Sequence, residues 1–290
     1  MNDKERLSDL SEFLKLVLFS GWVKPEGGNK PVSAMLVARF ESGKTSVLGQ
    51  FMGAKGVLYM SDVTEYGLVK QYLDPLSKGQ IKHIIIPDFI KSINRKKTTV
   101  DTLITFFNSL IEEGIVNIST FALRLELKKP IKAALLTSIA VEDFTRMQRR
   151  LAAIGFLSRF MILSYDYDKN YIKTIMHEIA QSHGEWAQDK LRLPGSEVRV
   201  HLPGGLAEQM IPRAEAIGER LHSYGFRAMH MLMSLVKASA LSDRRDEVNM
   251  DDIVRVLRLS EDYLGLRYNR IGISGKVERQ LPLMSNGKAK

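Results

Sequence analysis

Residues 31–45, with the sequence PVSAMLVARFESGKT, decide the fold expected for this chain. The apolar run at 31–37 follows a connector rich in Gly and Pro, GWVKPEGGNKP, and has the length of a buried strand. A loop over 38–43 comes next, and a helix is expected over 44–52. A strand, a loop and a helix in direct succession indicate a parallel sheet to which later segments add strands.

The chain up to residue 165 continues to alternate between apolar runs and helical patterns. Helices are expected at 5–20, 65–73 (ending before Pro75), 99–113 and 144–154, and strands at 57–60, 81–86, 131–137 and 160–165. The runs 115–121 and 123–127 predict a hairpin that turns at 128–130 into the next strand. The β-branched run IKHIII at 81–86 is typical of a strand buried on both faces. These patterns predict an α/β fold with a parallel sheet between layers of helices.

The strand signals stop after Asp166. Helical patterns follow at 171–186, 205–221, 226–241 and 250–266, interrupted by an extended piece at 197–202. We therefore expect an N-terminal helix and connector at 1–30, an α/β nucleotide-binding core at 31–168, an all-helical lid at 169–268 and a mobile tail at 269–290.

Composition limits the classes of function. The 290 residues contain 42 Lys and Arg against 33 Asp and Glu, a net charge of +9 that is compatible with a nucleic-acid partner. The absence of cysteine excludes disulfides and thiolate metal sites. No apolar run has the length of a membrane span, and the charged start MNDKERLSDL does not resemble a secretory signal. We expect a soluble, cytoplasmic protein that does not enter membranes.

The segment Ala38–Thr45, ARFESGKT, predicts a loop that binds nucleotide phosphates. Its pattern is that of a phosphate loop, G-x-x-x-x-G-K-[ST], with Ala38 in place of the first glycine. Gly43 allows the backbone to approach the phosphates, Lys44 reaches the outer phosphates, and the Thr45 hydroxyl binds Mg²⁺. The expected ligand is ATP, and the expected binding residues are Ala38, Ser42, Gly43, Lys44, Thr45 and Ser46.

Asp88 supplies the acidic group that such an enzyme needs. It follows a buried strand, where a carboxylate can hold Mg²⁺ or orient the attacking water. The common arrangement has two consecutive acids, whereas Pro87 precedes Asp88 here and Phe89 follows it. Slow or conditional hydrolysis is therefore expected.

From about residue 30 to residue 265 the chain resembles the AAA+ ATPases, and within them the motor domain of minichromosome maintenance-type replicative helicases. The resemblance rests on GKT at 43–45, IIPDFIK at 85–91, the hairpin region 104–130, LLTSI at 135–139, GFLSRF at 155–160 and the lid-like segment 226–259. The family's long N-terminal DNA-binding region and its C-terminal winged helix have no counterpart here. The resemblance is to a divergent, minimal motor of the kind a virus or mobile element carries.

The resemblance implies further site residues. Asp88 takes the place of the catalytic glutamate, and Pro87 replaces the aspartate on the metal side. Ser138, or its neighbour Thr137, takes the place of the polar sensor near the γ-phosphate. Arg159 corresponds to the arginine finger that reaches a neighbouring subunit's nucleotide, and Arg227 to the second sensor. In the family the hairpin touches DNA in the central channel of a ring, and the basic residues around it here are Arg124, Lys128, Lys129 and Lys132.

The function that these features predict is a DNA-dependent motor or helicase in DNA replication, working as a homo-oligomer, a hexameric ring, with ATP and Mg²⁺. Two alternatives stay open: a nucleotide-switched loader, initiator or scaffold with weak hydrolysis, and an ATPase that remodels proteins. Each site residue also has a plainer interpretation. Asp88 can be a turn residue, Arg159 and Arg227 solvated surface residues, and Thr137 and Ser138 strand residues satisfied by the backbone.

Overall fold

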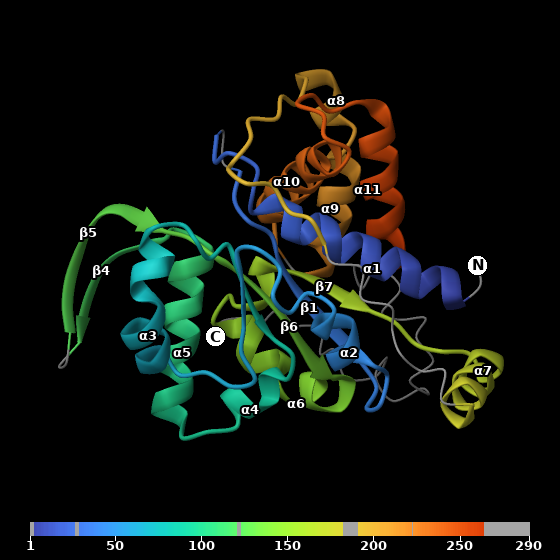
Figure 1. Cartoon of the computed structure of the whole chain (residues 1–290), viewed down its shortest axis with the longest axis horizontal. Coiled ribbons are helices and arrows are strands. Elements are labelled where there is room, and N and C mark those ends of the chain that lie inside the picture. Colours follow the sequence, from blue (N-terminus) through green and yellow to red (C-terminus); the bar gives the residue numbers. More distant parts are fainter. Residues whose placement is uncertain (1–2, 27–28, 121–122, 182–190, 222, 264–290) are drawn as a thin grey trace, which may run out of the picture.

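The computed structural model describes residues 3–26, 29–120, 123–181, 191–221 and 223–263, and it shows a parallel sheet between layers of helices (Figure 1). Five strands make up the sheet, in the order β2 (Val57–Tyr59), β3 (His83–Ile86), β6 (Ala134–Ala140), β1 (Ser33–Ala38) and β7 (Phe160–Ser164). Each neighbouring pair is parallel. The prediction of an α/β fold with a parallel sheet flanked by helices is therefore confirmed.

The direction of the crossovers places the helices on two faces. The connection from β1 to β2 runs along the sheet in one direction, and all later connections run in the other. Because such crossovers are right-handed, α2 (Lys44–Gly49) covers one face, while α3 (Glu65–Ser77), α4 (Phe89–Ile93), α5 (Lys97–Ile111) and α6 (Val141–Ala153) cover the other. Alternate residues of β1 accordingly enter different cores, with Leu36 on the α2 side and Val37 on the other.

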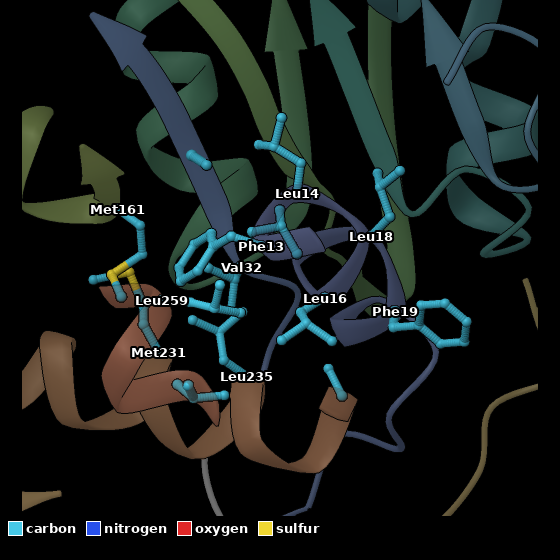
Figure 2. Packing of buried hydrophobic residues seen from close by; sticks show 14 of the residues in the cluster. Phe13, Leu14, Leu16, Leu18, Phe19, Val32, Met161, Met231, Leu235 and Leu259 are labelled. Atoms are coloured by element: carbon cyan, nitrogen blue, oxygen red, sulfur yellow. The ribbon is translucent and has the colours of Figure 1, made fainter. Parts of the chain in front are cut away.

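Helix α1 (Asp3–Ser20) fills the space that α2 leaves on its face of the sheet. It lies between the strands and the helices α10 (Phe226–Ser242) and α11 (Met250–Tyr263). Figure 2 shows Leu14 and Leu18 on the side of the strands and Leu16 on the side of Leu235 of α10. The helix is buried on two sides, so its apolar residues are not confined to one stripe. The segment 3–20 and the C-terminal helices therefore share one hydrophobic core with the sheet.

The hairpin of β4 (Ile115–Thr120) and β5 (Leu123–Ile131) projects beside α3 and α5 (Figure 1). The turn predicted at 128–130 is wrong, because β5 continues through these residues until Ile131 pairs with Ile115. Both isoleucines are buried, and this burial holds the base of the hairpin against the core. The following strand consequently begins at Ala134, three residues after the predicted start.

Two other predicted boundaries are wrong for reasons connected with proline. Helix α3 continues past Pro75 to Ser77, because a proline in the last turn removes one hydrogen bond while Leu76 gains a buried position. The single helix predicted at 205–221 is two helices, α8 (Gly204–Glu208) and α9 (Ile211–Arg220), with Pro212 in the first turn of α9.

The remaining differences are smaller. The short helices α4 and η1 (Leu157–Arg159) were not predicted, and α7 spans Lys169–Ala180. The extended piece at 197–202 makes single bridges from Val198 to Val23 and from His201 to Glu247. The predicted tail at 269–290 lies outside the described residues. Within the part of the chain that the structure describes, no helix is both long and apolar enough to cross a membrane.

His83, the first residue of β3, is a buried titratable group at the amino edge of the sheet. It packs against Gly21, where an added Cβ atom would lie 2.8 Å from the imidazole Cε1 atom. Burial lowers the pKa of His83 from 6.5 to about 4. The imidazole is therefore neutral in the folded protein at neutral pH.

We expect acidification to destabilise the fold through His83. The unfolded chain binds the proton below pH 6.5 and the folded chain only near pH 4, so stability is lost as the pH falls through this window. Going from pH 7 to pH 5 should cost about 2 kcal/mol of unfolding free energy through this residue. Urea denaturation at both values, with His83→Met as the non-titrating control, measures the difference. An equal loss in the variant would contradict the assignment.

Candidate functional site

The loop at 39–43 leaves the carboxyl end of β1, the strand between β6 and β7. Ala38 and Ala140 are paired, so the ends of β1 and β6 lie side by side. Gly43 has a φ of 76° and directly precedes α2, and Glu41 has a φ of 60°. Two left-handed residues in this short stretch make the chain turn sharply and leave the first backbone N–H groups of α2 facing the loop.

Lys44 folds back over this loop. Its ammonium donates hydrogen bonds to the carbonyl oxygen of Ala38 at 3.0 Å, to the carbonyl of Arg39 and to the Ser42 hydroxyl at 3.2 Å. Burial lowers the pKa of Lys44, and the negative charges of Glu142 and Asp88 act in the opposite direction. The structure thus brings the predicted residues Ala38, Ser42 and Lys44 together at the end of β1.

Two tyrosines after β7 hold the loop from the other side. The hydroxyls of Tyr165 and Tyr167 both donate to the Ser42 carbonyl oxygen, at 2.9 and 2.7 Å. Burial raises the pKa of Tyr165 to about 12, so its hydroxyl remains a donor at physiological pH. Sequence reasoning missed this support. The signal was the pair of tyrosines in YDYD at 165–168, directly after a strand that adjoins β1.

Two carboxylates lie near the Lys44 ammonium. Asp88 precedes α4, and its side chain is 39% exposed and lies 3.3 Å from the Lys91 ammonium. Glu142 is an exposed residue in the first turn of α6, two positions after β6 ends beside Ala38. Glu142 was not predicted, although an acid just beyond a buried strand was visible in the sequence. The site therefore has a second acidic group, which comes from the helix that follows the neighbouring strand.

The hydroxyls of Thr137 and Ser138 donate hydrogen bonds to backbone carbonyls of the neighbouring strand and of the turn that follows it. Thr137 donates to the Ile86 carbonyl oxygen at 2.6 Å, and Ser138 donates to the Pro87 carbonyl oxygen. Both side chains are buried. These bonds connect β6 to the end of β3 and to the turn that leads into Asp88.

The remaining predicted residues of the loop suit a magnesium nucleotide. Thr45 and Ser46 are exposed in the first turn of α2, next to Lys44. Mg²⁺ prefers oxygen ligands and is usually held by one or two protein groups together with substrate phosphates. The Thr45 hydroxyl and the carboxylates of Asp88 and Glu142 provide that chemistry. Among the described residues, no three His, Cys, Asp or Glu side chains form a separate metal cluster.

Arg159 and Arg227 lie together, but at the amino ends of the parallel strands, opposite to the loop. Arg159 precedes Phe160, which pairs with Ser33 at the start of β1, whereas the loop follows Ala38 at its end. The length of β1 separates the two edges by roughly 16 Å. Within one chain neither arginine lies at the loop that follows β1.

Both arginines pair with Glu112, which follows α5. The Glu112 carboxylate lies 3.0 Å from Arg227 Nε, 3.6 Å from Arg159 Nε and 2.6 Å from Lys30 Nζ. Arg227 also donates to the Ser158 hydroxyl at 3.0 Å. We refer to Lys30, Glu112, Arg159 and Arg227 as the Glu112 cluster.

The predicted DNA-binding residues surround the hairpin. Lys129 and Lys132 are exposed, while the side chains of Arg124 and Lys128 lie outside the described part of the structure. A groove of about 560 Å³ runs between α5 and the start of β4, and it is lined in part by Glu65, Asp101 and Glu113. Its three carboxylates make it unsuited to phosphate groups.

Comparisons with known proteins add no family: neither the models of protein families nor the curated proteins contain a match to this chain.

The left-handed conformation of Gly43 predicts that a substitution at this position lowers the free energy of unfolding. We expect Gly43→Ala to destabilise the protein by about 1–2 kcal/mol, because a Cβ atom strains this conformation even where space is open. Gly49→Ala in the same helix is the control, since its Cβ atom meets nothing closer than 3.9 Å and alanine favours the helix. Urea denaturation of both variants measures the contrast. Equal stabilities would show that the loop does not need the left-handed glycine.

Proposed function

We propose that this chain is an ATP-binding AAA+ ATPase that works as a ring-forming, DNA-dependent motor or helicase in DNA replication. The observation that carries the proposal is the placement of Lys44. Its ammonium sits in a sharply turned loop at the end of a central parallel strand, near enough to Asp88 and Glu142 for their charges to act on its pKa. In open α/β folds, ligands such as nucleotides usually bind at the carboxyl ends of the parallel strands.

The proposed chemistry uses groups that already surround the loop. Backbone N–H groups at the start of α2 and the Lys44 ammonium would bind the phosphates, and Thr45 with the two acids would hold Mg²⁺, which neutralises phosphate charge. Asp88 or Glu142 would orient and polarise the attacking water. Lys44 would then exchange its bonds to the loop carbonyls for bonds to phosphate oxygens.

The placement of Arg159 and Arg227 supports a site shared between two copies. Both lie about one strand length from the loop of their own chain, so they can act on a nucleotide only if a second copy presents it. Beside Arg227, the rings of Tyr224 and Phe226 stack 5.7 Å apart and are 87% and 72% exposed. An aromatic pair of this kind suits a protein contact. In such an assembly, the end of the sheet that carries the loop contacts the end that carries the arginines on the next copy. This is a head-to-tail contact, and it closes into a ring when the rotation from one copy to the next permits.

Mixing two inactive variants tests the shared site. We expect Lys44→Ala to lose ATP binding, and Arg159→Ala to bind ATP but to lose turnover by on the order of 10³-fold. A mixture of the two should regain part of the ATPase activity, because an intact loop of one variant can meet an intact arginine of the other. Phosphate release at matched total protein, with mass measurement in ATP, gives the readout. A mixture as inactive as its components would exclude catalysis in trans.

A nucleotide-switched loader, initiator or scaffold is the second candidate. It is favoured by the contacts around Pro87 and Asp88. The Asp88 carboxylate is paired with Lys91, and the Ser138 hydroxyl donates to the Pro87 carbonyl oxygen. These contacts suit an enzyme that holds ATP and hydrolyses it slowly.

DNA dependence separates the motor from the switch. If the chain is a motor, single-stranded DNA should accelerate ATP turnover. The double variant Lys129→Ala, Lys132→Ala should then bind DNA more weakly. The slope of its log binding constant against log salt concentration should also be smaller by about one unit per lysine. Lys96→Ala, Lys97→Ala at the start of α5 is the charge-matched control. Tight ATP binding with turnover that ignores DNA would instead support the switch. Turnover accelerated only by a protein would favour a remodelling ATPase.

A further inference from the structure

The Glu112 cluster joins four separate segments of the chain through one carboxylate. Lys30 comes from the connector before β1, Arg159 from the turn before β7 and Arg227 from the first turn of α10. Glu112 itself lies at the end of α5, just before the hairpin begins at Ile115. The contacts therefore link the sheet, the C-terminal helices and the base of the hairpin.

The cluster holds more positive than negative charge, and two of its three cations are largely buried while Arg227 is exposed. Three cations face one carboxylate, which leaves an excess of two positive charges. The side chains of Lys30 and Arg159 are 11% and 12% exposed. Burial and the charge of Arg227 lower the pKa of Arg159, and Arg159 Nε has no hydrogen-bond partner among the described residues. Glu112 is thus the anion that holds these repelling cations close together.

The ionised state of Glu112 is supported by its neighbours. Its burial acts to raise its pKa, but hydrogen bonding and the charge of Lys30, together with the two arginines, lower it overall. A single carboxylate oxygen, Oε2, faces Arg159 and Arg227, while Oε1 accepts the bond from Lys30. The two oxygens therefore have different roles, one toward the arginine pair and one toward the connector.

The hairpin is joined tightly to this carboxylate. Gly114, two residues after Glu112, has a φ of 87°, and an added Cβ atom would lie 2.7 Å from Pro130 Cβ and 2.9 Å from Lys132 Cγ. Ile115 and Ile131 pair and are buried directly beyond it. This close packing lies two residues from Glu112, so a displacement of the hairpin base can reach the backbone at Glu112.

We infer that Glu112 is a positioning residue, whose carboxylate sets the guanidinium groups of Arg159 and Arg227 for a phosphate presented by a second copy and couples their position to the hairpin. The inference rests on the proposed function and adds to it a residue and a connection. Glu112 touches no reacting atom in this scheme. It acts by keeping two cations aligned that would otherwise separate.

The variant Glu112→Gln tests the positioning role. We expect ATP affinity to stay unchanged, because the phosphate loop lies at the other edge of the sheet. We expect kcat to fall on the order of 10²-fold, since a small misplacement of a charge-stabilising group has that effect, and DNA to lose its stimulation. Wild-type turnover and DNA stimulation in an assembled Glu112→Gln protein would overturn the inference.

The double variant Lys30→Gln, Glu112→Gln separates positioning from charge balance. In the double variant, two arginines without Glu112 carry an excess of two positive charges, as the native cluster does. The unfolding midpoint of the double variant in urea should therefore return toward the wild-type value. Its kcat should nevertheless remain low, whereas Lys30→Gln alone keeps Glu112 on the arginines and should keep kcat. Recovery of kcat in the double variant would show that Glu112 only balances charge.

Two measurements keep this test distinct from the proposed function. If Lys44→Ala binds ATP as the wild-type chain does, the proposed function fails whatever Glu112 does. Hydrogen exchange then still tests the connection without turnover, because Glu112→Gln should raise exchange at the start of β4 and at the start of α10 together. A change at only one of these places would overturn the coupling.

Discussion

The burial of β1 between β6 and β7 is the constraint on which the rest of the structure depends. All six residues of this strand are buried, and its parallel neighbours fix where each end lies. At the carboxyl end the chain must leave the sheet beside the end of β6, so the loop, Lys44 and Glu142 come together. At the amino end, the start of β7 puts Arg159 beside the first residues of β1. A parallel sheet thus separates two charged regions by the length of a strand.

Each charged region combines cations with carboxylates, but in a different balance. At the loop, the ammonium of the half-buried Lys44 donates to two backbone carbonyls, and the charges of Asp88 and Glu142 act on it. In the Glu112 cluster, three cations share one carboxylate, which offsets part of their mutual repulsion. The first arrangement suits a magnesium nucleotide, and the second suits an anion brought from outside the chain. This difference in charge supports the proposal that two copies share one site.

Helix α1 explains why the C-terminal helices are firmly attached to the sheet. Only α2 follows a crossover on its face, and α2 has six residues, so most of that face must be covered by other segments. Helix α1 supplies the cover, and α10 and α11 pack on its outer side. The first turn of α10 is thereby held near Glu112, which brings Arg227 to the cluster. The position of Arg227 therefore depends on packing at the far end of the chain.

The local sequence was sufficient for most of the elements and for the position of the loop between β1 and α2. Alternating apolar runs and helical patterns identified the sheet and most helices, because periodicity reports burial directly. The pattern at 38–45 is contiguous, so a phosphate loop could be predicted there before the fold was known. Boundaries were predicted less well where long-range packing decided them, as at Pro75, where the helix continues, and at Ile131, where burial extends β5.

What only the tertiary structure decided are the contacts between residues distant in sequence. Glu142 approaches Lys44 because β6 adjoins β1, and Tyr165 and Tyr167 reach Ser42 because β7 lies on the other side. Glu112, Arg159 and Arg227 come from three segments, and no local pattern relates them. Their meeting depends on strand order and on the packing of α10 over α1, which follow from how the whole core is filled. A local pattern was therefore enough to predict the loop, while strand order brought Glu142 and the two tyrosines to it and placed the two arginines at the other end of β1.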